Sequence, residues 1–399
     1  MTALADCYNI ADLRAAARKR LPKGVFEFVD RGSEDEVALR NNRAGFERIK
    51  LRPRSLVDVS GRSTQTTLFG KPAGLPLAIA PTGAAGLCWY EGELQLAKAA
   101  AAAKVPFTLA TGAMTSMEKI AKEAGGRLWM QLYLWNDREL SYQLVQRAEH
   151  AGFEALILTV DTVVSPNREY NPRNGFALPF HPTTRAVVDM LTHPRWLGGV
   201  LVRYLTTTGM PRYENLPEEF RRKITADPSQ KDITRQDTLN WDDVRKLRDL
   251  WPRVLMVKGI MRADEAVRAV EYGADAVIVS NHGGRNLDSA MASIDALPEI
   301  VEAIGDRATV ILDSGVRRGS DIAKALALGA KAVLVGRATL YGTAVGGEAG
   351  ALHALTLLSN ELDRTMAYTC CNTVEEIGPD ILYLPRDRNR LGAMLAAGV

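Results

Sequence analysis

Short apolar runs recur along this chain, and helical patterns rich in alanine or charged residues lie between most of them. Runs of this kind are typical of parallel strands that are buried on both faces. There are eight: Leu77–Pro81, Phe107–Thr111, Leu128–Tyr133, Ala155–Asp161, Val254–Gly259, Ala276–Asn281, Val310–Ser314 and Ala332–Arg337. Eight strand–helix alternations predict an α/β fold, specifically a (β/α)8 TIM barrel.

The main alternative for this pattern is an open, doubly wound α/β sheet. The number of strands argues against it, as does the absence of a GxGxxG turn after the first strand. In a barrel, the active site forms at the carboxyl ends of the strands. Several predicted strands end in polar side chains that can meet there: Gln131, Tyr133, Asp161, Lys258, His282, Asp313 and Arg337.

Two segments do not follow the repeat. Residues 1–75 are predicted to form helices that pack over the barrel as an N-terminal cap. Residues 162–253, between the fourth and fifth strands, are far longer than one crossover needs, so they form a long insertion. The end of this insertion, Ala226–Thr238, is polar, and we expect it to be mobile. We predict that residues 1–399 make up a single domain.

The start of the insertion, residues 185–212, combines apolar and aromatic residues with arginines. The apolar and aromatic members include Val187, Val188, Leu191, Trp196, Leu197, Val200, Leu201 and Tyr204, and the basic ones are Arg185, Arg195, Arg203 and Arg212. Such a composition suits a segment that lies on a membrane surface. It suits a subunit interface or an active-site lid just as well, so the pattern leaves all three open.

Composition narrows the classes of function. Of the 399 residues, 46% are hydrophobic and 24% are charged, as in an ordinary soluble enzyme. The net charge of +3 is too small to indicate a nucleic-acid partner. The N-terminus is polar and charged, unlike a secretory signal, and no apolar stretch is long enough to span a bilayer.

The four cysteines, Cys7, Cys88, Cys370 and Cys371, form no CxxC pair. We therefore expect free thiols and a reducing, cytoplasmic environment. Neither a metal-ligand spacing nor a Walker motif is present, so we expect no metal site.

The segment Ser280–Asp288 follows a β-branched strand and carries the clearest chemical signal of the chain. His282 can take a proton near neutral pH, and Arg285 can hold a carboxylate through two parallel hydrogen bonds. Two glycines between them permit a sharp turn or the close approach of a ligand. The alternative is a plain turn with a surface histidine and arginine. Because Asn281 and Asp288 accompany the pair, we favour chemistry on a small acid.

A second signal follows the seventh and eighth strands, where TIM barrels often hold a phosphate. Gly315 and Gly336 permit close backbone approach, and Arg317 and Arg337 can neutralise an anion. Ser320 is the expected N-cap of the next helix. The alternative is a pair of glycine turns with surface arginines, but two such sites on consecutive strands favour phosphate binding.

With these residues in place, the chain resembles the FMN-dependent (S)-2-hydroxy acid dehydrogenases and oxidases, and most closely the branch of (S)-mandelate and L-lactate dehydrogenases. The resemblance extends from about Tyr8 to Thr373. It is carried by Leu21–Lys23, Ala80–Gly83, Gln131–Tyr133, Thr159–Thr162, Val257–Gly259, Ser280–Asp288 and Asp313–Gly319. It implies an FMN cofactor and the oxidation of an (S)-2-hydroxy acid to the 2-oxo acid.

The resemblance also implies a role for each catalytic candidate. His282 would take a proton from the substrate, and Asp161 would support the protonated imidazole. Arg168 and Arg285 would hold the substrate carboxylate. Tyr133 would face the substrate hydroxyl.

The remaining candidates would bind FMN. Lys258 would lie beside the flavin N1 and O2 and stabilise the negative charge of the reduced form. Gln131 and Thr159 would contact the isoalloxazine edge. The backbone near N5 would be that of Pro81, Thr82 and Gly83. The ribityl chain and phosphate would be bound by Asp313, Gly315, Arg317, Gly336 and Arg337.

Two positions depart from the family pattern. Phe28 stands where the family usually has a tyrosine that reaches the substrate carboxylate, and Ala110 replaces a usual serine near the flavin. Gly112 follows shortly after Ala110, so the wall here is small and leaves room for an aromatic substrate. Gly83 is the residue found in the mandelate dehydrogenase branch, whereas oxidases of the family often carry alanine there.

Three functions remain open from the sequence. We favour a dehydrogenase that passes electrons to a quinone or another acceptor, forms a homotetramer and contacts the inner face of the cell membrane peripherally through residues 185–212. The second is an oxidase that produces hydrogen peroxide. The third is a non-redox barrel that binds FMN or phosphate, against which His282, Asp161 and the arginine pair argue.

Overall fold

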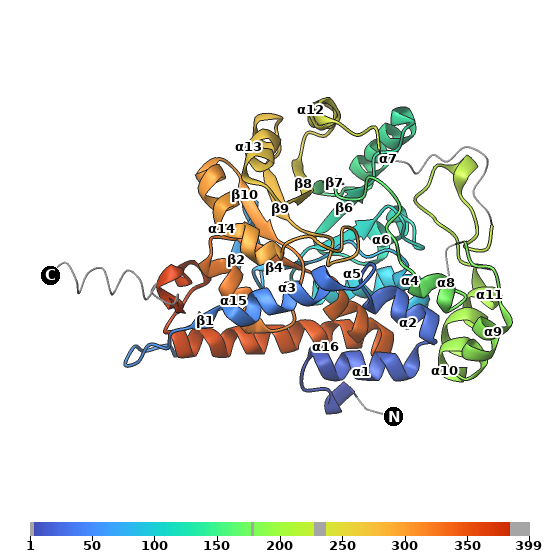
Figure 1. The fold of residues 1–399 in the computed structure, drawn as a ribbon, viewed down its shortest axis with the longest axis horizontal. Helices are drawn as coiled ribbons and strands as arrows, with labels where there is room; N and C mark the ends of the chain where they lie inside the picture. The colour runs from blue at the N-terminus through green and yellow to red at the C-terminus, as the bar shows by residue number, and fades with distance from the viewer. Residues whose placement is uncertain (1–3, 177–178, 227–236, 384–399) are drawn as a thin grey trace, which may run out of the picture.

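A closed barrel of eight parallel strands forms the centre of the molecule, in the order β10-β11-β4-β5-β6-β7-β8-β9 (Figure 1). The structure, a computed structural model, describes residues 4–176, 179–226 and 237–383. The barrel strands are β4 (Leu77–Ile79), β5 (Phe107–Ala110), β6 (Leu128–Leu132), β7 (Ala155–Thr159), β8 (Val254–Ile260), β9 (Ala276–Val279), β10 (Thr309–Leu312) and β11 (Ala332–Val335). Each overlaps one predicted run, so the TIM barrel is confirmed and the open sheet is excluded.

Most of these strands end one or two residues earlier than the sequence predicts. β4 ends at Ile79 rather than at Pro81, because proline cannot donate to the ladder. β7 ends at Thr159, and Asp161 belongs to the loop that follows. The polar residues after these strands lie in the loops beyond the sheet, and they form the rim of the barrel mouth.

One crossover helix follows each barrel strand and covers the outside of the barrel. These helices are α5 (Gly92–Ala102), α6 (Met117–Glu123), α7 (Arg138–His150), α12 (Trp241–Leu250), α13 (Ala263–Glu271), α14 (Ser293–Ile304), α15 (Gly319–Ala327) and α16 (Arg337–Thr369), with a short α4 (Ala85–Cys88) before α5. The barrel interior is filled by side chains that alternate along the strands, including Ala78, Trp129, Ile157, Met256, Ile278, Ile311 and Leu334. The barrel is therefore a packed core, and its chemistry must lie at one end.

Helices occupy only part of the N-terminal segment 1–75. They are α1 (Ile10–Arg20), α2 (Lys23–Asp30) and α3 (Val37–Arg48), after a short helical turn, η1 (Leu4–Asp6). β1 (Lys50–Leu51) then pairs with β12 (Leu382–Tyr383), after the turns η5 (Val374–Glu376) and η6 (Pro379–Ile381). The hairpin β2 (Thr66–Leu68) and β3 (Lys71–Ala73) closes the other end of the barrel, where Phe69 lies edge-on to Trp129 at 5.9 Å. The helical cap thus ends at Arg48.

The insertion after β7 forms a group of short helices at one edge of the molecule, beside α2 (Figure 1). They are α8 (Tyr170–Arg173), α9 (Thr184–Leu191), α10 (Pro194–Trp196), the π-helical turn η2 (Leu197–Val202), α11 (Arg203–Thr207) and η3 (Glu218–Phe220). Most of the stretch 226–238, expected to be mobile, lies outside the described residues. None of the helices described is both long and apolar enough to cross a bilayer.

Candidate active site

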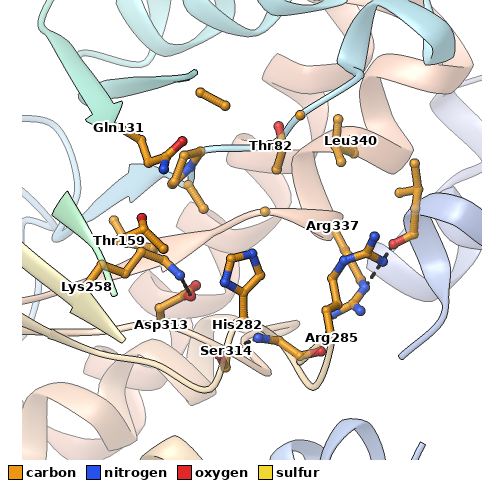
Figure 2. Close-up of a pocket in the computed structure, with 18 of the residues that line it drawn as sticks. Thr82, Gln131, Thr159, Lys258, His282, Arg285, Asp313, Ser314, Arg337 and Leu340 are labelled. Atoms are coloured by element: carbon orange, nitrogen blue, oxygen red, sulfur yellow. Dashed lines mark hydrogen bonds and ion pairs between the residues drawn. The ribbon is translucent and has the colours of Figure 1, made fainter. Parts of the chain in front are cut away.

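A cavity of about 230 Å³ opens at the carboxyl ends of the strands. It brings together fifteen of the sixteen candidates that the sequence singles out. They are Pro81, Thr82, Gly83, Gln131, Tyr133, Thr159, Arg168, Lys258, His282, Arg285, Asp313, Gly315, Arg317, Gly336 and Arg337. The sixteenth, Asp161, lies directly behind His282. Figure 2 shows His282 pointing into the open centre, with Lys258 and Asp313 on one side and Arg285 and Arg337 on the other.

His282 and Asp161 form the pair that a proton transfer needs. His282 Nδ1 lies 2.7 Å from Asp161 Oδ1. With a carboxylate as partner, Nδ1 carries the proton, and Nε2 is left as an acceptor that faces the cavity. Asn286 holds Asp161 in place, because its Nδ2 donates to the Asp161 carbonyl at 2.8 Å and to Thr162 Oγ1 at 2.9 Å. Asn286 is a supporting residue that the sequence did not single out.

The backbone around His282 explains the glycines of this motif. His282, Gly283 and Gly284 have φ values of 58°, 68° and 70°, in the left-handed region that favours glycine. A Cβ on Gly284 would lie 2.5 Å from the backbone N of Leu39 in α3. Ser280 Oγ accepts a hydrogen bond of 3.0 Å from the His282 N–H. The loop is therefore strained locally and is held by the N-terminal cap.

Gly259 permits a second close approach at the end of β8. Its φ is 108°, and a Cβ there would lie 2.6 Å from Asp161 Cβ. The β8–β9 register shifts between Lys258 and Ile260 at this glycine. Asp161 can therefore sit against the strand that carries Lys258.

The electrostatic surroundings of His282 favour a neutral imidazole. Burial lowers the pKa of His282 below its ordinary 6.5, and Asp161 only partly offsets this. Burial alone would raise the pKa of Asp161, but His282 and Lys258 together keep it below its usual range. At neutral pH the imidazole is neutral and Asp161 is ionised, which is the arrangement a general base requires.

Lys258 is a buried cation between two carboxylates. Its Nζ lies 3.3 Å from Asp313 Oδ2 and 4.0 Å from Asp161 Oδ2, and it donates to Ser280 Oγ at 3.0 Å. Burial opposes its charge, but Asp313 and Asp161 raise its pKa above the usual value. Lys258 is therefore a fixed positive charge in the wall of the cavity.

Arg168 and Arg285 lie together in the cavity without a carboxylate partner in the described part of the chain. Arg285 Nη1 donates to the Arg31 carbonyl at 2.9 Å, and Arg168 Nη2 reaches the Arg285 carbonyl at 3.4 Å. Burial and the neighbouring Arg168 lower the pKa of Arg285 to about 10. Two half-buried guanidiniums that lack a counter-charge form a suitable site for a small carboxylate.

Tyr133, Phe28 and Ala110 complete the walls on the substrate side. Burial raises the pKa of Tyr133, so its phenol keeps its proton and can donate a hydrogen bond. The Phe28 ring lies 5.5 Å from the Arg285 guanidinium. Phe28 thus does lie in the cavity, where it offers a ring face to the cation in place of a hydroxyl.

Unpartnered polar atoms test whether a flavin suits this cavity. Gln131 Oε1 accepts a hydrogen bond of 3.1 Å from the Thr111 N–H, but Gln131 Nε2 has no partner. Thr159 Oγ1 also has none, although both residues are buried in the wall. Because buried polar groups are nearly always satisfied, a polar ligand edge belongs beside them. The predicted contacts of Gln131 and Thr159 with the isoalloxazine edge fit this requirement.

The end of the cavity that the sequence predicts to bind phosphate combines Asp313, Gly315 and Arg317 with Gly336 at the start of α16. Arg337 Nε, Nη1 and Nη2 donate to the carbonyls of Val29, Gly283 and Arg31 at 3.1, 2.8 and 3.1 Å. Three of its five N–H donors are thus used on the protein backbone, and two remain for an anion.

Ser320 is not the N-cap of α15, which begins at Gly319. Asp321 Oδ2 instead accepts from the Arg317 and Arg318 N–H groups at 2.9 and 3.0 Å. A carboxylate bound to two N–H groups satisfies the helix end better than one hydroxyl does. The turn that carries Arg317 is therefore fixed by the helix that follows it.

The chain is similar to known proteins over nearly its whole length. The model of the FMN-dependent dehydrogenase family matches residues 17–384. The chain is 42% identical to (S)-mandelate dehydrogenase of Pseudomonas putida over 94% of each protein. It is 44% identical to L-lactate oxidase of Nostoc sp. over 96% of this chain and all of the relative. A crystal structure of the monotopic membrane protein (S)-mandelate dehydrogenase superimposes with a TM-score of 0.89, at 42% identity over 95% of this chain and 99% of the other.

Proposed function

This chain belongs to the FMN-dependent dehydrogenase family, and from that premise we propose that it oxidises an aromatic (S)-2-hydroxy acid and passes the electrons to a quinone-type acceptor. FMN-dependent oxidation of a 2-hydroxy acid is the activity of the family. The observation that carries the proposal is the His282–Asp161 pair, which faces the same cavity as Arg168 and Arg285, two arginines with no carboxylate partner among the described residues.

In the proposed reaction His282 Nε2 accepts a proton from the substrate. Asp161 lies 2.7 Å from the other ring nitrogen and stabilises the imidazolium that forms. A positioned base of this kind contributes about 10²–10⁴-fold to the rate. FMN, when bound, would supply the two-electron redox chemistry that the side chains lack. Lys258 provides the positive charge that the reduced cofactor needs.

Arg168 and Arg285 bind the substrate carboxylate and thereby orient the carbon that reacts. Tyr133 keeps its proton and donates a hydrogen bond to the substrate hydroxyl. The neutral His282 and the protonated Tyr133 thus take opposite roles toward the substrate.

The side-chain pocket favours an aromatic acid. A Cβ built on Gly112 would meet nothing within 4 Å, and one on Gly83 would meet only the Gly112 carbonyl at 3.8 Å. Both glycines line the cavity, together with Ala110 and Phe28. Because this wall carries only small residues, we propose that it leaves room beside the cofactor for a phenyl ring as well as for the methyl group of lactate.

The insertion supports a membrane-bound acceptor. Five large apolar residues are exposed on its helices: Val187, Val188, Leu191, Val202 and Leu205. Exposed apolar residues beside arginines are typical of a helix that lies in a membrane interface. We therefore propose peripheral contact with the inner face of the cell membrane and a quinone as the acceptor. The free, buried cysteines agree with a reducing compartment.

The second candidate is an oxidase that makes hydrogen peroxide, because one of the similar proteins is an L-lactate oxidase. Stopped-flow reoxidation of the reduced enzyme separates the two. Reoxidation by dioxygen as fast as by an artificial quinone, with stoichiometric peroxide, would make this protein an oxidase. We expect the quinone to be faster.

The experiment that tests the whole proposal uses the colour of the enzyme. Purified protein should be yellow and should bleach without oxygen when a substrate is added. A panel of lactate, glycolate, mandelate and hydroxymandelates ranks the acids by rate. If none of the acids bleaches the enzyme, the redox function is contradicted. Light scattering tests the homotetramer that we also propose, which requires four times the 43.6-kDa mass of one chain.

A further inference from the structure

A second cavity, of about 210 Å³, lies between the insertion and the N-terminal cap, and it shares no lining residue with the active-site cavity. Its wall is almost entirely carbon and includes Val25, Leu87, Phe176, Trp196, Val200 and Ile224. An apolar cavity of about 150 Å³ already excludes water and takes up a small hydrocarbon. This larger cavity is therefore suited to an apolar ligand.

Four polar side chains along the wall, those of Asn174, Asp189, Trp196 and Tyr204, are engaged with the protein itself. Asn174 Nδ2 donates to Glu27 Oε2 at 2.6 Å, and Asp189 Oδ2 accepts from the Gly24 N–H at 3.4 Å. Trp196 Nε1 donates to the Leu87 carbonyl at 2.6 Å, and the Tyr204 hydroxyl accepts from the Glu91 N–H at 2.9 Å. These groups offer little to a polar ligand, so the occupant must bind through its hydrocarbon part.

The cavity reaches the apolar surface of the insertion. Val187 lines it and is 38% exposed, while Val188 and Leu191 on the same helix are 55% and 62% exposed. Helix α9 thus presents one face to the cavity and another to the outside. An acyl chain that enters past Val187 would pass from the surface of the protein directly into the cavity.

Three arginines near this region, Arg20, Arg195 and Arg203, have no acidic partner among the described residues. Arg20 stacks on Trp89 at 4.4 Å and Arg203 stacks on Tyr90 at 4.2 Å, and no carboxylate of the described segments pairs with either. Arg195 is exposed and lies close enough to Arg20 to lower its pKa, after the larger effect of burial. Fixed cations beside an apolar opening complement a ligand with an anionic head and a hydrocarbon tail.

We propose that this cavity takes the acyl chain of an anionic membrane lipid, whose headgroup lies among Arg20, Arg195 and Arg203. The proposal rests on the peripheral membrane contact proposed above, since the lipid must come from a bilayer. One consequence concerns the active site. Phe176 in the cavity wall packs edge-on against Phe28 at 5.7 Å, and Phe28 lines the active-site cavity. A bound chain would therefore support the wall between the two cavities.

The test measures binding of lysophosphatidylglycerol, which has one chain and an anionic head, to the full-length holoenzyme below the micelle concentration. Ala186 lines the cavity, whereas Val188 points outward from the same helix. Ala186→Phe should weaken binding by about tenfold or more, which is 1.4 kcal/mol or more. Val188→Phe is the matched control and should leave the affinity within about twofold of the wild type. Flavin content and turnover verify that each variant is folded.

Equal binding by Ala186→Phe and Val188→Phe would overturn the cavity assignment. If Ala186→Phe does not fold, Val200→Phe fills the cavity from the opposite wall. Lysophosphatidylcholine with the same chain should bind more weakly, and equal affinity would overturn the role of the arginines. Stoichiometric binding of a prenyl quinone without binding of the lysolipid would also overturn the proposal. Liposome sedimentation distinguishes a failure of the lipid cavity from a failure of the membrane contact on which it rests. If both variants still pellet with liposomes but bind lysolipid equally, only the cavity assignment is contradicted. If the wild type never pellets, the membrane contact itself is contradicted.

Discussion

Replacing His282 with glutamine isolates its role as a base. Glutamine keeps a polar side chain at the mouth of the barrel but cannot take up a proton. We expect His282→Gln to retain FMN and to lose turnover by about 10²–10⁴-fold, the usual contribution of a positioned base. Flavin absorbance and steady-state turnover measure the two effects separately. A yellow, folded variant with near wild-type turnover would remove His282 from the mechanism.

The pH dependence follows from the direction of the shift at His282. The base must be neutral, and its pKa lies below the ordinary 6.5 because of burial. His282 therefore becomes half protonated only when the pH falls to this lowered pKa, so kcat/KM should be level at neutral pH and decline on the acid side. The profile of kcat/KM against pH reports the pKa of His282 in the free enzyme and is the measurement that checks this expectation. An acid limb centred above 6.5 would contradict the assignment.

The arginine pair should control affinity for the carboxylate. Arg168→Met or Arg285→Met removes a charged hydrogen bond, which contributes about 1.5–3 kcal/mol. Oxalate resembles the substrate carboxylate and does not react, so flavin titration with oxalate reports binding alone. Each variant should bind oxalate more weakly by the corresponding factor. Unchanged oxalate affinity in both variants would place the carboxylate elsewhere.

At the scale of the element, the barrel strands were predictable because each is a short apolar run with polar residues after it. Those end residues also predicted the composition of the cavity, since parallel strands bring their carboxyl ends together. The sequence could not reveal Asn286 as the residue that holds Asp161, because that contact joins separate loops. Nor could the sequence show that Arg337 donates to three backbone carbonyls, because two of these carbonyls belong to the distant N-terminal cap.

The hairpin β2–β3 was missed for a different reason. Its strands have three residues each, too few for a periodic pattern to distinguish them from loop. The stability of the hairpin comes from its position, because Leu68 and Ala73 pack against the interior of the barrel. Tertiary contacts rather than local preference therefore determine this element.

Residues 185–212 should attach the protein to anionic membranes as one element. Their exposed apolar residues would enter the interface, and their arginines would meet the anionic headgroups. We expect the wild type to pellet with anionic liposomes and a version with a short linker in place of this segment to stay in the supernatant. Turnover of a small acid with a soluble acceptor serves as the folding control. Equal pelleting of both forms would instead indicate a lid or an interface.

At the scale of the whole molecule, the charge of the active-site cavity calls for anions. Five cations line it, Arg168, Lys258, Arg285, Arg317 and Arg337, against one carboxylate, Asp313. Burial, and to a smaller extent a neighbouring arginine, lowers the pKa of each of the four arginines. Their positive charges are therefore unfavourable in the cavity without a counter-charge. The phosphate of FMN and the substrate carboxylate would together supply that charge.

Removal of FMN should therefore destabilise the fold. A ligand that binds only the native state raises stability by mass action, by about 2.7 kcal/mol at a hundred times its dissociation constant. Thermal unfolding of the apoprotein, with FMN or riboflavin added back, measures the effect. FMN should raise the melting temperature more than riboflavin, which has no phosphate. An equal rise with both would show that the phosphate end contributes little.

The loop of His282 is held by parts of the chain that are far apart in sequence. The Ser33 N–H donates to the Gly284 carbonyl at 3.0 Å, and Arg337 joins the carbonyls of Arg31 and Gly283. On the ribosome, residues 31–33 emerge first and then wait for some three hundred more to be made before Arg337 can reach them. A nascent or prematurely ended chain therefore cannot hold the histidine in place, and catalytic competence should be acquired late and all at once, after most of the protein has been synthesised.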